Sequence, residues 1–426
     1  MGEWLTRLTL ITIGFIIGIV TLEFGLNIFA PSPSIPKRMF LEPDRYIGYK
    51  GIHNVEGKWK EGKIESYVKM NSLGFRDDEY GYGKNEGVFR IVVLGDSFTL
   101  GLQVELDKTY HSILEDKLNS SGNGTFEVIN LGLDGFSTGQ QYLAFKHYGL
   151  KYQPDLVILA FFIRNDVREN SLWLSSLLAG KSIDQFKRHH PFFVLNDGKL
   201  EELPFEIEVS RSNRNTEQNR GVRSLPARFF PNIYYSLREW AGETPWLADS
   251  LWKLGIKKSG PVNQSELRKN RIRNRILMDS NVYAEEYTPE WRDAWEVTKA
   301  LILKLAQELE MDKIKFLVVV IPDEREFRPD RWDRILKEYP YLKHFKFDLR
   351  KPEHILSGFL EANNISYLLL RPEFEKYSQE TGKDLHFHYS YDNHWNTNGH
   401  ELAARLIYEK LRDDELVPVT KQNIID

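Results

Sequence analysis

The chain has 426 residues and no cysteine, which excludes disulfide bonds, thiol catalysis and cysteine-ligated metal sites. Its 57 basic and 61 acidic residues give a net charge of -4, so no overall positive charge attracts it to nucleic acid, and we predict no nucleic-acid partner. The length is sufficient for a large core and allows two or three domain-sized units.

The first expected element is an apolar segment over residues 8–29, whose only charged side chain is Glu23. As a helix rising about 1.5 Å per residue it would reach ~33 Å, enough to cross a hydrocarbon core of about 30 Å. A cleaved signal peptide is the alternative, but no small-x-small cleavage site follows, and Ala30 directly precedes Pro31. We therefore predict that residues 1–30 form a single-pass membrane anchor. Our hypothesis for its orientation is that the rest of the chain is extracytoplasmic.

Residues 31–87 are expected to form a spacer and an irregular lead-in. Prolines at positions 31, 33 and 36 make the first part stiff and extended, so it would separate the body of the protein from the membrane. The mixed polar and aromatic sequence that follows favours a few short strands.

From residue 88 the apolar pattern becomes regular, and short apolar runs alternate with amphipathic segments. The third run, residues 155–162, is almost continuously apolar, as expected of a strand that is buried on both faces. Strands that alternate with helices predict right-handed crossovers and a parallel sheet covered by helices, hence an α/β fold. The expected strands are residues 90–94, 126–131, 155–162, 315–321 and 365–370, and the expected helices are residues 109–118, 138–148 with Thr138 as the cap, 288–309 and 398–411.

The regular pattern lapses over residues 169–287, which divides the expected α/β domain into residues 88–168 and 288–415. About 120 residues are too many for a structureless loop in a compact domain, so we predict a mainly helical insertion. Basic residues cluster within residues 211–223 and again within residues 268–275. Solvated helix faces are the ordinary interpretation of such clusters, and a lid or a groove that recognises an anionic polymer is the functional alternative.

Candidate chemical groups follow the first three expected strands and precede the last helix. Ser97 stands in a Gly-Asp-Ser turn after the first strand, at the edge of the sheet where α/β folds bind ligands. Histidine is the usual base for a serine hydroxyl and a carboxylate fixes its tautomer, roles for which His394 and Asp392 are the candidates. The oxyanion of a tetrahedral intermediate needs preorganised donors. The backbone N–H groups of Ser97 and Gly135 and the side-chain amide of Asn165 are the candidates for this oxyanion hole.

In these motifs the chain resembles the SGNH or GDSL-type serine esterases and acyltransferases. The four blocks of that family centre on a serine, a glycine, an asparagine and a histidine, which Ser97, Gly135, Asn165 and His394 match in the same order. The resemblance implies a three-layer α/β/α, flavodoxin-like fold with a mostly parallel five-stranded sheet. It covers residues 89–170 and 313–411.

Two positions depart from the family pattern. Ile163 stands where the third block usually has a glycine, two residues before its asparagine. The acid of the last block usually lies three residues before the histidine, but Tyr391 occupies that position, and Asp392 lies only two residues before His394. The resulting Asp-x-His-Trp motif is similar to a pattern in bacterial polysaccharide O-acetylation proteins, which place it ahead of the serine.

The resemblance and the predicted location imply a hydrolase that cleaves an ester through an acyl-serine intermediate. We expect it to remove a short acyl group, such as acetyl, from a carbohydrate or cell-envelope polymer. An O-acyltransferase that passes the acyl group to a polysaccharide hydroxyl would use the same residues, because the two activities differ only in acceptor binding and water exclusion. An inactive carbohydrate-binding or assembly protein that retains the fold is the second alternative. The expected partners are an acylated polymer and the membrane.

Several potential metal ligands lie within a short segment near the end of the chain. Their spacing fits no familiar zinc pattern, and one of the histidines falls in or near the final helix. We therefore predict no metal and no other cofactor. The residues concerned are His386, His388, Asp392, His394 and His400.

Overall fold

The chain divides into two compact units, of which the larger comprises residues 36–207 and 271–426. This larger unit contains every strand that the structure describes. The computed structural model describes residues 40–122, 124–187, 190–205, 273–388 and 393–418, with scattered positions between residues 4 and 21.

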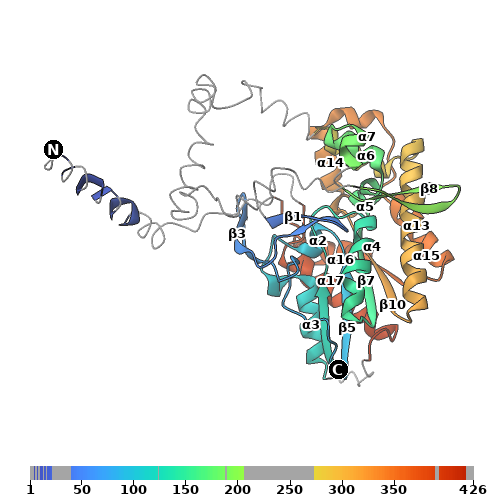
Figure 1. Cartoon of the computed structure of the whole chain (residues 1–426). Helices are drawn as coiled ribbons and strands as arrows, with labels where there is room; N and C mark the ends of the chain where they lie inside the picture. Colours follow the sequence, from blue (N-terminus) through green and yellow to red (C-terminus); the bar gives the residue numbers. More distant parts are fainter. Residues whose placement is uncertain are drawn as a thin grey trace. The chain divides into compact units, whose positions relative to one another are not determined.

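A five-stranded sheet forms the centre of the larger unit (Figure 1). All neighbouring strands are parallel. If the strands are numbered along the chain, their order across the sheet is 2-1-3-4-5, which is typical of flavodoxin-like folds. The prediction of a three-layer α/β fold around a five-stranded sheet is therefore confirmed. The order across the sheet is β11 (Tyr367–Leu369), β10 (Lys315–Ile321), β7 (Leu156–Phe162), β5 (Val88–Leu94) and β6 (Thr125–Asn130).

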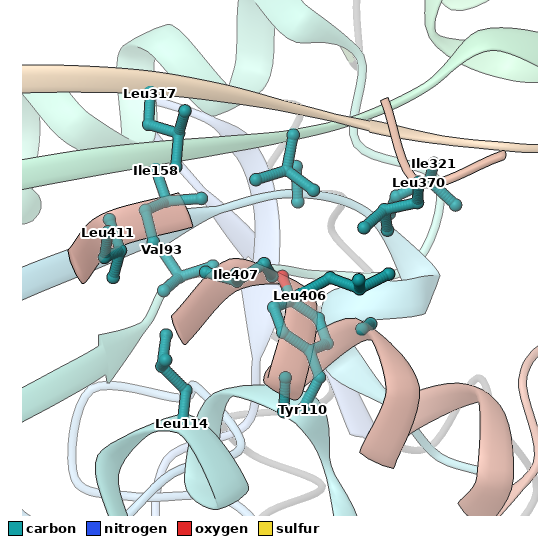
Figure 2. Packing of buried hydrophobic residues seen from close by; sticks show 14 of the residues in the cluster. Val93, Tyr110, Leu114, Ile158, Leu317, Ile321, Leu370, Leu406, Ile407 and Leu411 are labelled. Atoms are coloured by element: carbon teal, nitrogen blue, oxygen red, sulfur yellow. The ribbon is translucent and has the colours of Figure 1, made fainter. Parts of the chain in front are cut away.

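The helices α3 (Tyr110–Ser120) and α17 (Thr397–Asp413), which are far apart in the sequence, pack against each other on one face of the sheet. Apolar side chains recur at helical spacing in both, so each helix presents one buried stripe. These stripes meet alternate residues of the central strands in one buried cluster. Figure 2 shows Tyr110, Leu114, Leu406, Ile407 and Leu411 of the helices together with Val93, Ile158 and Leu317 of the sheet.

The helices α4 (Thr138–His147) and α13 (Pro289–Met311) pack against each other and against β5 and β10 (Figure 1). The cap of α4 is Ser137, so the prediction of Thr138 was wrong by one residue. The physical reason is a capping box: Ser137 Oγ accepts from the N–H of Gln140 at 3.2 Å, and the Gln140 side chain accepts from the N–H of Ser137 at 3.3 Å.

The lead-in is tied to the segment after β5 by the buried guanidinium of Arg76. Its Nη atoms donate to the carbonyl oxygens of Leu100 at 3.2 Å and of Val104 at 2.7 Å. Burial lowers the pKa of Arg76 to about 10. The lead-in therefore supports the loop that follows α2 (Ser97–Leu100). Its short strands form two antiparallel hairpins, β1 (Leu41–Asp44) with β2 (Gly48–Gly51) and β3 (Glu56–Glu61) with β4 (Ile64–Lys69).

The predicted insertion, residues 169–287, is described only at its two ends, and residues 206–272 lie outside the described residues. The first end contains short helices and an antiparallel hairpin. The hairpin packs beside α4, where the rings of Phe193 and Tyr142 meet edge to face with centroids 5.9 Å apart. The elements of this end are α6 (Leu172–Ala179), α7 (Ile183–Lys187), β8 (Phe192–Asn196) and β9 (Lys199–Leu203), whereas α5 (Ile163–Glu169) ends where the insertion begins.

The connection from β10 to β11 contains helices that the sequence analysis did not predict. It contains α14 (Pro329–Glu338) and α15 (Lys351–Ala362), and α16 (Arg371–Thr381) follows β11. Short 3₁₀ helices complete the described elements. These are η2 (Leu106–Lys108), η3 (Gly149–Tyr152), η4 (Asn281–Tyr283), η5 (Glu324–Glu326) and η6 (Pro340–His344).

The smaller unit comprises residues 1–35 and 208–270. Its described residues between positions 4 and 21 are helical. Within the part of the chain that the structure describes, no helix combines the length and apolar character needed to cross a bilayer. Much of the predicted anchor, residues 1–30, lies outside the described residues, so the anchor stays a prediction.

Candidate active site

The turn after β5 places Ser97 at the first residue of α2. Glycine is required at Gly95, because a Cβ there would lie 2.0 Å from the Oγ1 of Thr99. Asp96 caps the helix, with its Oδ1 accepting a hydrogen bond from the N–H of Phe98 at 2.9 Å. The turn therefore holds the partly exposed Ser97 side chain at the carboxyl edge of the sheet.

The imidazole of His394 lies within hydrogen-bond distance of this serine, with Nε2 2.7 Å from Ser97 Oγ. The histidine loop is fixed by backbone pairing, since the N–H of Phe387 donates to the carbonyl of His394 at 2.8 Å. The ring of Phe98 packs against the imidazole at a centroid distance of 4.8 Å. A serine hydroxyl and an imidazole at this distance have the geometry that activation of a hydroxyl by a base requires.

Asp392, the predicted acid, falls within residues 389–392, outside the part of the chain that the structure describes. Its role rests on the sequence spacing and stays a prediction. The described neighbour on that side of His394 is Asn393, whose Oδ1 accepts a hydrogen bond from Arg164 at 3.0 Å.

Gly135, whose N–H is a predicted oxyanion donor, lies in the loop after β6. Its φ of +70° is in the left-handed region that favours glycine. The N–H of Leu133 donates to the carbonyl of Gly95 at 3.4 Å, which joins this loop to the nucleophile turn. The hydroxyl of Tyr49 donates to the carbonyl of Asp134 at 2.6 Å and fixes the loop from the side of the lead-in.

Asn165 lies in the first turn of α5, directly after β7. Its side-chain Nδ2 donates to Asp96 Oδ2 at 3.0 Å and to Glu169 Oε2 at 3.2 Å. The reverse orientation of the amide would direct its oxygen at both carboxyl groups, so the position of the nitrogen is well determined by its partners. The structure thus brings Asn165 to the nucleophile turn, as the sequence predicted.

Both amide hydrogens of Asn165 are engaged by carboxyl groups in this structure. Because a side-chain amide has only two hydrogens, donation to an oxyanion requires that one of these bonds open or be shared. The longer bond, to Glu169, is the one we expect to yield. Burial raises the pKa of Glu169 to about 7, against the opposing charge of Arg168. Burial likewise raises the pKa of Asp96, although the N–H of Phe98 and the Asn165 amide oppose it.

No family model and no curated protein matches the chain. Solved structures do resemble it. One is an acetyl xylan esterase, 13% identical, which covers 75% of this chain and 98% of its own at a TM-score of 0.36. Another is a lipase/acylhydrolase from Enterococcus faecalis, 13% identical, with 76% and 96% covered and a TM-score of 0.35. A third is a putative acylhydrolase from Bacteroides fragilis, 13% identical, with 78% and 89% covered and a TM-score of 0.33. The chemistry of this chain therefore has to be argued from its own residues.

The histidines near the end of the chain have separate surroundings. His394 faces Ser97, and the Nδ1 of His400 accepts a hydrogen bond from the N–H of Tyr110 at 3.2 Å. His386 is only 2% exposed, and burial lowers its pKa to about 3. The histidines that the sequence grouped therefore do not converge on one point among the described residues.

Within the described ranges, Glu324, Asp384 and His388 form a group whose oxygen and nitrogen atoms lie close enough to share a cation. Arg331 already places a positive charge there, with its Nε 3.2 Å from Glu324 and its Nη2 3.5 Å from Asp384. We interpret the group as an ion-pair network between the buried Glu324 and its more exposed neighbours.

A second charged group at the carboxyl edge, Arg164, Asp323 and Arg325, was missed by the sequence analysis. Asp323 is fully buried and stands two residues after the end of β10. The sequence pattern that identified Ser97, a polar residue just after a buried strand, also applies to Asp323 and could have identified it. The pairing of Asp323 with Arg164 joins segments far apart in the sequence and had no local signal.

Proposed function

We propose that the protein is a serine esterase that cleaves short acyl esters through an acyl-serine intermediate. The observation that carries the proposal is the 2.7 Å contact between His394 Nε2 and Ser97 Oγ at the carboxyl edge of a parallel sheet. A serine hydroxyl is a weak nucleophile until a base removes its proton, and a neutral imidazole within hydrogen-bond distance is such a base.

In the first step of the proposed reaction, Ser97 Oγ attacks the ester carbonyl carbon while His394 Nε2 takes the hydroxyl proton. The carbonyl oxygen becomes an oxyanion, which the N–H groups of Ser97 and Gly135 and a released hydrogen of Asn165 would stabilise. The ester C–O bond then breaks, and His394 returns its proton to the departing oxygen, which leaves as an alcohol. Water, deprotonated by His394, attacks the acyl carbon; the bond between Ser97 Oγ and the acyl carbon breaks, His394 returns the proton to Oγ, and the carboxylic acid leaves.

We further propose that the acyl group is acetyl and that it is carried by a carbohydrate or cell-envelope polymer. The support is the predicted membrane anchor, residues 1–30, and the resemblance of the motifs to the SGNH family. In an O-acyltransferase a sugar hydroxyl would take the place of water in the second step, with the same protein groups. The insertion, residues 169–287, is proposed as a lid or a recognition element for the polymer.

Full-length protein in detergent should hydrolyse aryl acetate and an acetylated oligosaccharide faster than aryl octanoate. Ser97→Ala should abolish turnover, with a loss on the order of 10⁴–10⁶ in rate, while Ser120→Ala, at an exposed position in α3, serves as the matched control. Equal turnover by Ser97→Ala and wild type would refute the proposal. Acetylated sugar formed from an added acceptor would identify the transferase instead of the hydrolase.

The proposed location is tested by protease added to spheroplasts. If the protein has an N-terminal anchor, it should be found in the membrane fraction before protease is added. If the residues after the anchor are extracytoplasmic, external protease should then digest them. Complete protection of the residues after the anchor in intact spheroplasts would contradict the proposed orientation.

Charge-neutralising changes within residues 211–223 should lower turnover of the polymer but not of aryl acetate if the insertion recognises the polymer.

A further inference from the structure

Arg164 joins three segments that meet at the carboxyl edge of the sheet. It follows β7 on α5 and immediately precedes Asn165. Its Nη1 lies 3.2 Å from Oδ2 of Asp323, and its Nη2 donates to Oδ1 of Asn393 at 3.0 Å. Since Asp323 follows β10 and Asn393 immediately precedes His394, one guanidinium connects the asparagine segment, the β10 loop and the histidine loop.

The Asp323 end of this connection is rigid. Its fully buried carboxylate accepts from Arg325 Nε at 3.0 Å and from Arg325 Nη2 at 2.6 Å. Burial acts to raise the pKa of Asp323, but the charges of Arg325 and Arg164 outweigh it and hold that pKa well below its usual range. Asp323 therefore stays ionised, and Arg164 has a fixed charged partner.

The other end of the connection acts on the histidine loop. Backbone pairing with Phe387 holds the carbonyl of His394. On the preceding side, within the described residues, the side chain of Asn393 is held by Arg164. The imidazole has to stay at hydrogen-bond distance from Ser97, so a shift of this loop changes the distance on which proton transfer depends.

The shape of the guanidinium suits both contacts at once. Its two Nη atoms lie at separate corners of a rigid plane, whereas a lysine offers a single compact ammonium group. The side chain of Arg164 is only 19% exposed, and its guanidinium lies 5.0 Å from the centre of the Phe162 ring. Water therefore has little access to the contacts of Arg164 with Asp323 and Asn393 and cannot easily replace them.

We propose that Arg164 is a positioning residue that holds His394 against Ser97 through Asn393. The inference rests on the proposed esterase chemistry. The competing role, recognition of an anionic group on the substrate, is disfavoured because both Nη atoms already have acceptors and the side chain is largely buried.

The test is steady-state kinetics of the full-length protein on aryl acetate. Arg164→Met should lower kcat by about 10–100-fold with KM changed less than about 2-fold, because displacing a reacting group by about 1 Å can cost about 10²-fold. Asn393→Ala should reproduce most of this loss, and the double variant should be no slower than the slower single variant, because both changes break one connection. Arg164→Lys should not restore kcat, whereas Asn393→Asp, which keeps an acceptor, should retain most of it.

Arg405→Met, at an exposed arginine on α17, is the matched control and should leave kcat and KM unchanged. Losses that multiply in the double variant, or a raised KM with unchanged kcat, would overturn the proposal. If Arg164→Met does not fold, Asn393→Ala decides alone, because Asn393 is partly exposed and an unchanged kcat there is a negative result. A wild-type protein without Ser97-dependent turnover would refute the proposed function and this inference together, whereas an active wild type with unaffected variants would refute only the inference.

Discussion

Glu326 is a buried acid whose ionisation should make the stability of the protein depend on pH. It lies in η5, just after β10, and is 5% exposed. Burial, and then the negative charge of Asp323, raise the pKa of Glu326 to about 8, although the hydrogen bond from Tyr283 at 2.9 Å opposes this. In the unfolded chain the same carboxyl group has its ordinary pKa of 4.5. The folded state therefore holds a proton that the unfolded state releases.

The size of the effect follows from the gap between these two pKa values. A group with a raised folded pKa contributes stability that is complete below its unfolded pKa and is lost as the pH rises to the folded pKa. At about 1.36 kcal/mol per pKa unit, Glu326 should remove on the order of 3 kcal/mol from the free energy of unfolding between about pH 5 and pH 8. Glu326→Gln keeps the acceptor for Tyr283 and cannot ionise, so it should remove this part of the pH dependence.

The measurement is urea unfolding of wild type and Glu326→Gln, followed by tryptophan fluorescence at a series of pH values from 5 to 8. The free energy of unfolding of the variant should fall less steeply with pH, so the two curves separate toward pH 8. Glu338→Gln changes an exposed glutamate of α14 and should run parallel to wild type. A Glu326→Gln curve that also runs parallel to wild type would refute the reasoning.

Three further substitutions test the site and its supports. Asn165→Ala removes a proposed oxyanion donor and should lower kcat by about 10²–10³ with little change in KM, measured on aryl acetate; an unchanged kcat would remove Asn165 from the proposed oxyanion hole. Gly135→Ala forces a side chain into a positive φ and should lower the free energy of unfolding by about 1–2 kcal/mol, so an equally stable variant would contradict the described loop. Ser137→Ala removes the cap of α4 and should lower the midpoint of urea unfolding by an amount equivalent to about 1 kcal/mol, whereas Thr138→Ala should have a smaller effect.

The central strands could be predicted from the sequence because their burial on both faces demands continuous apolar runs. β10 begins and ends at the predicted residues, and α3 covers most of the helix predicted over residues 109–118. The cap of α4 was misplaced because two adjacent hydroxyl residues compete for it, and the choice depends on Gln140. The helices α14 and α15 went unpredicted, since they are short and α14 buries none of its side chains fully.

The candidate site was predictable to the extent that its residues follow strands. Ser97, Gly135 and Asn165 each stand just past a strand of a parallel sheet, and that placement predicts a common edge. The bond from Asn165 to Glu169 and the pairing of Arg164 with Asp323 could not be predicted, because they depend on side-chain directions and on contacts between distant segments. The acid role of Asp392 still rests on its spacing from the histidine.

Covalent labelling of Ser97 tests its proposed role as the nucleophile most directly. Full-length protein should be treated with a serine-directed fluorophosphonate, measured by intact mass and digested to locate the adduct. We expect one adduct, on Ser97, that is absent from Ser97→Ala and formed much more slowly by His394→Ala, because the proposed base lies 2.7 Å from the hydroxyl. An adduct on any other residue, or none on the folded wild-type protein, would contradict the central claim.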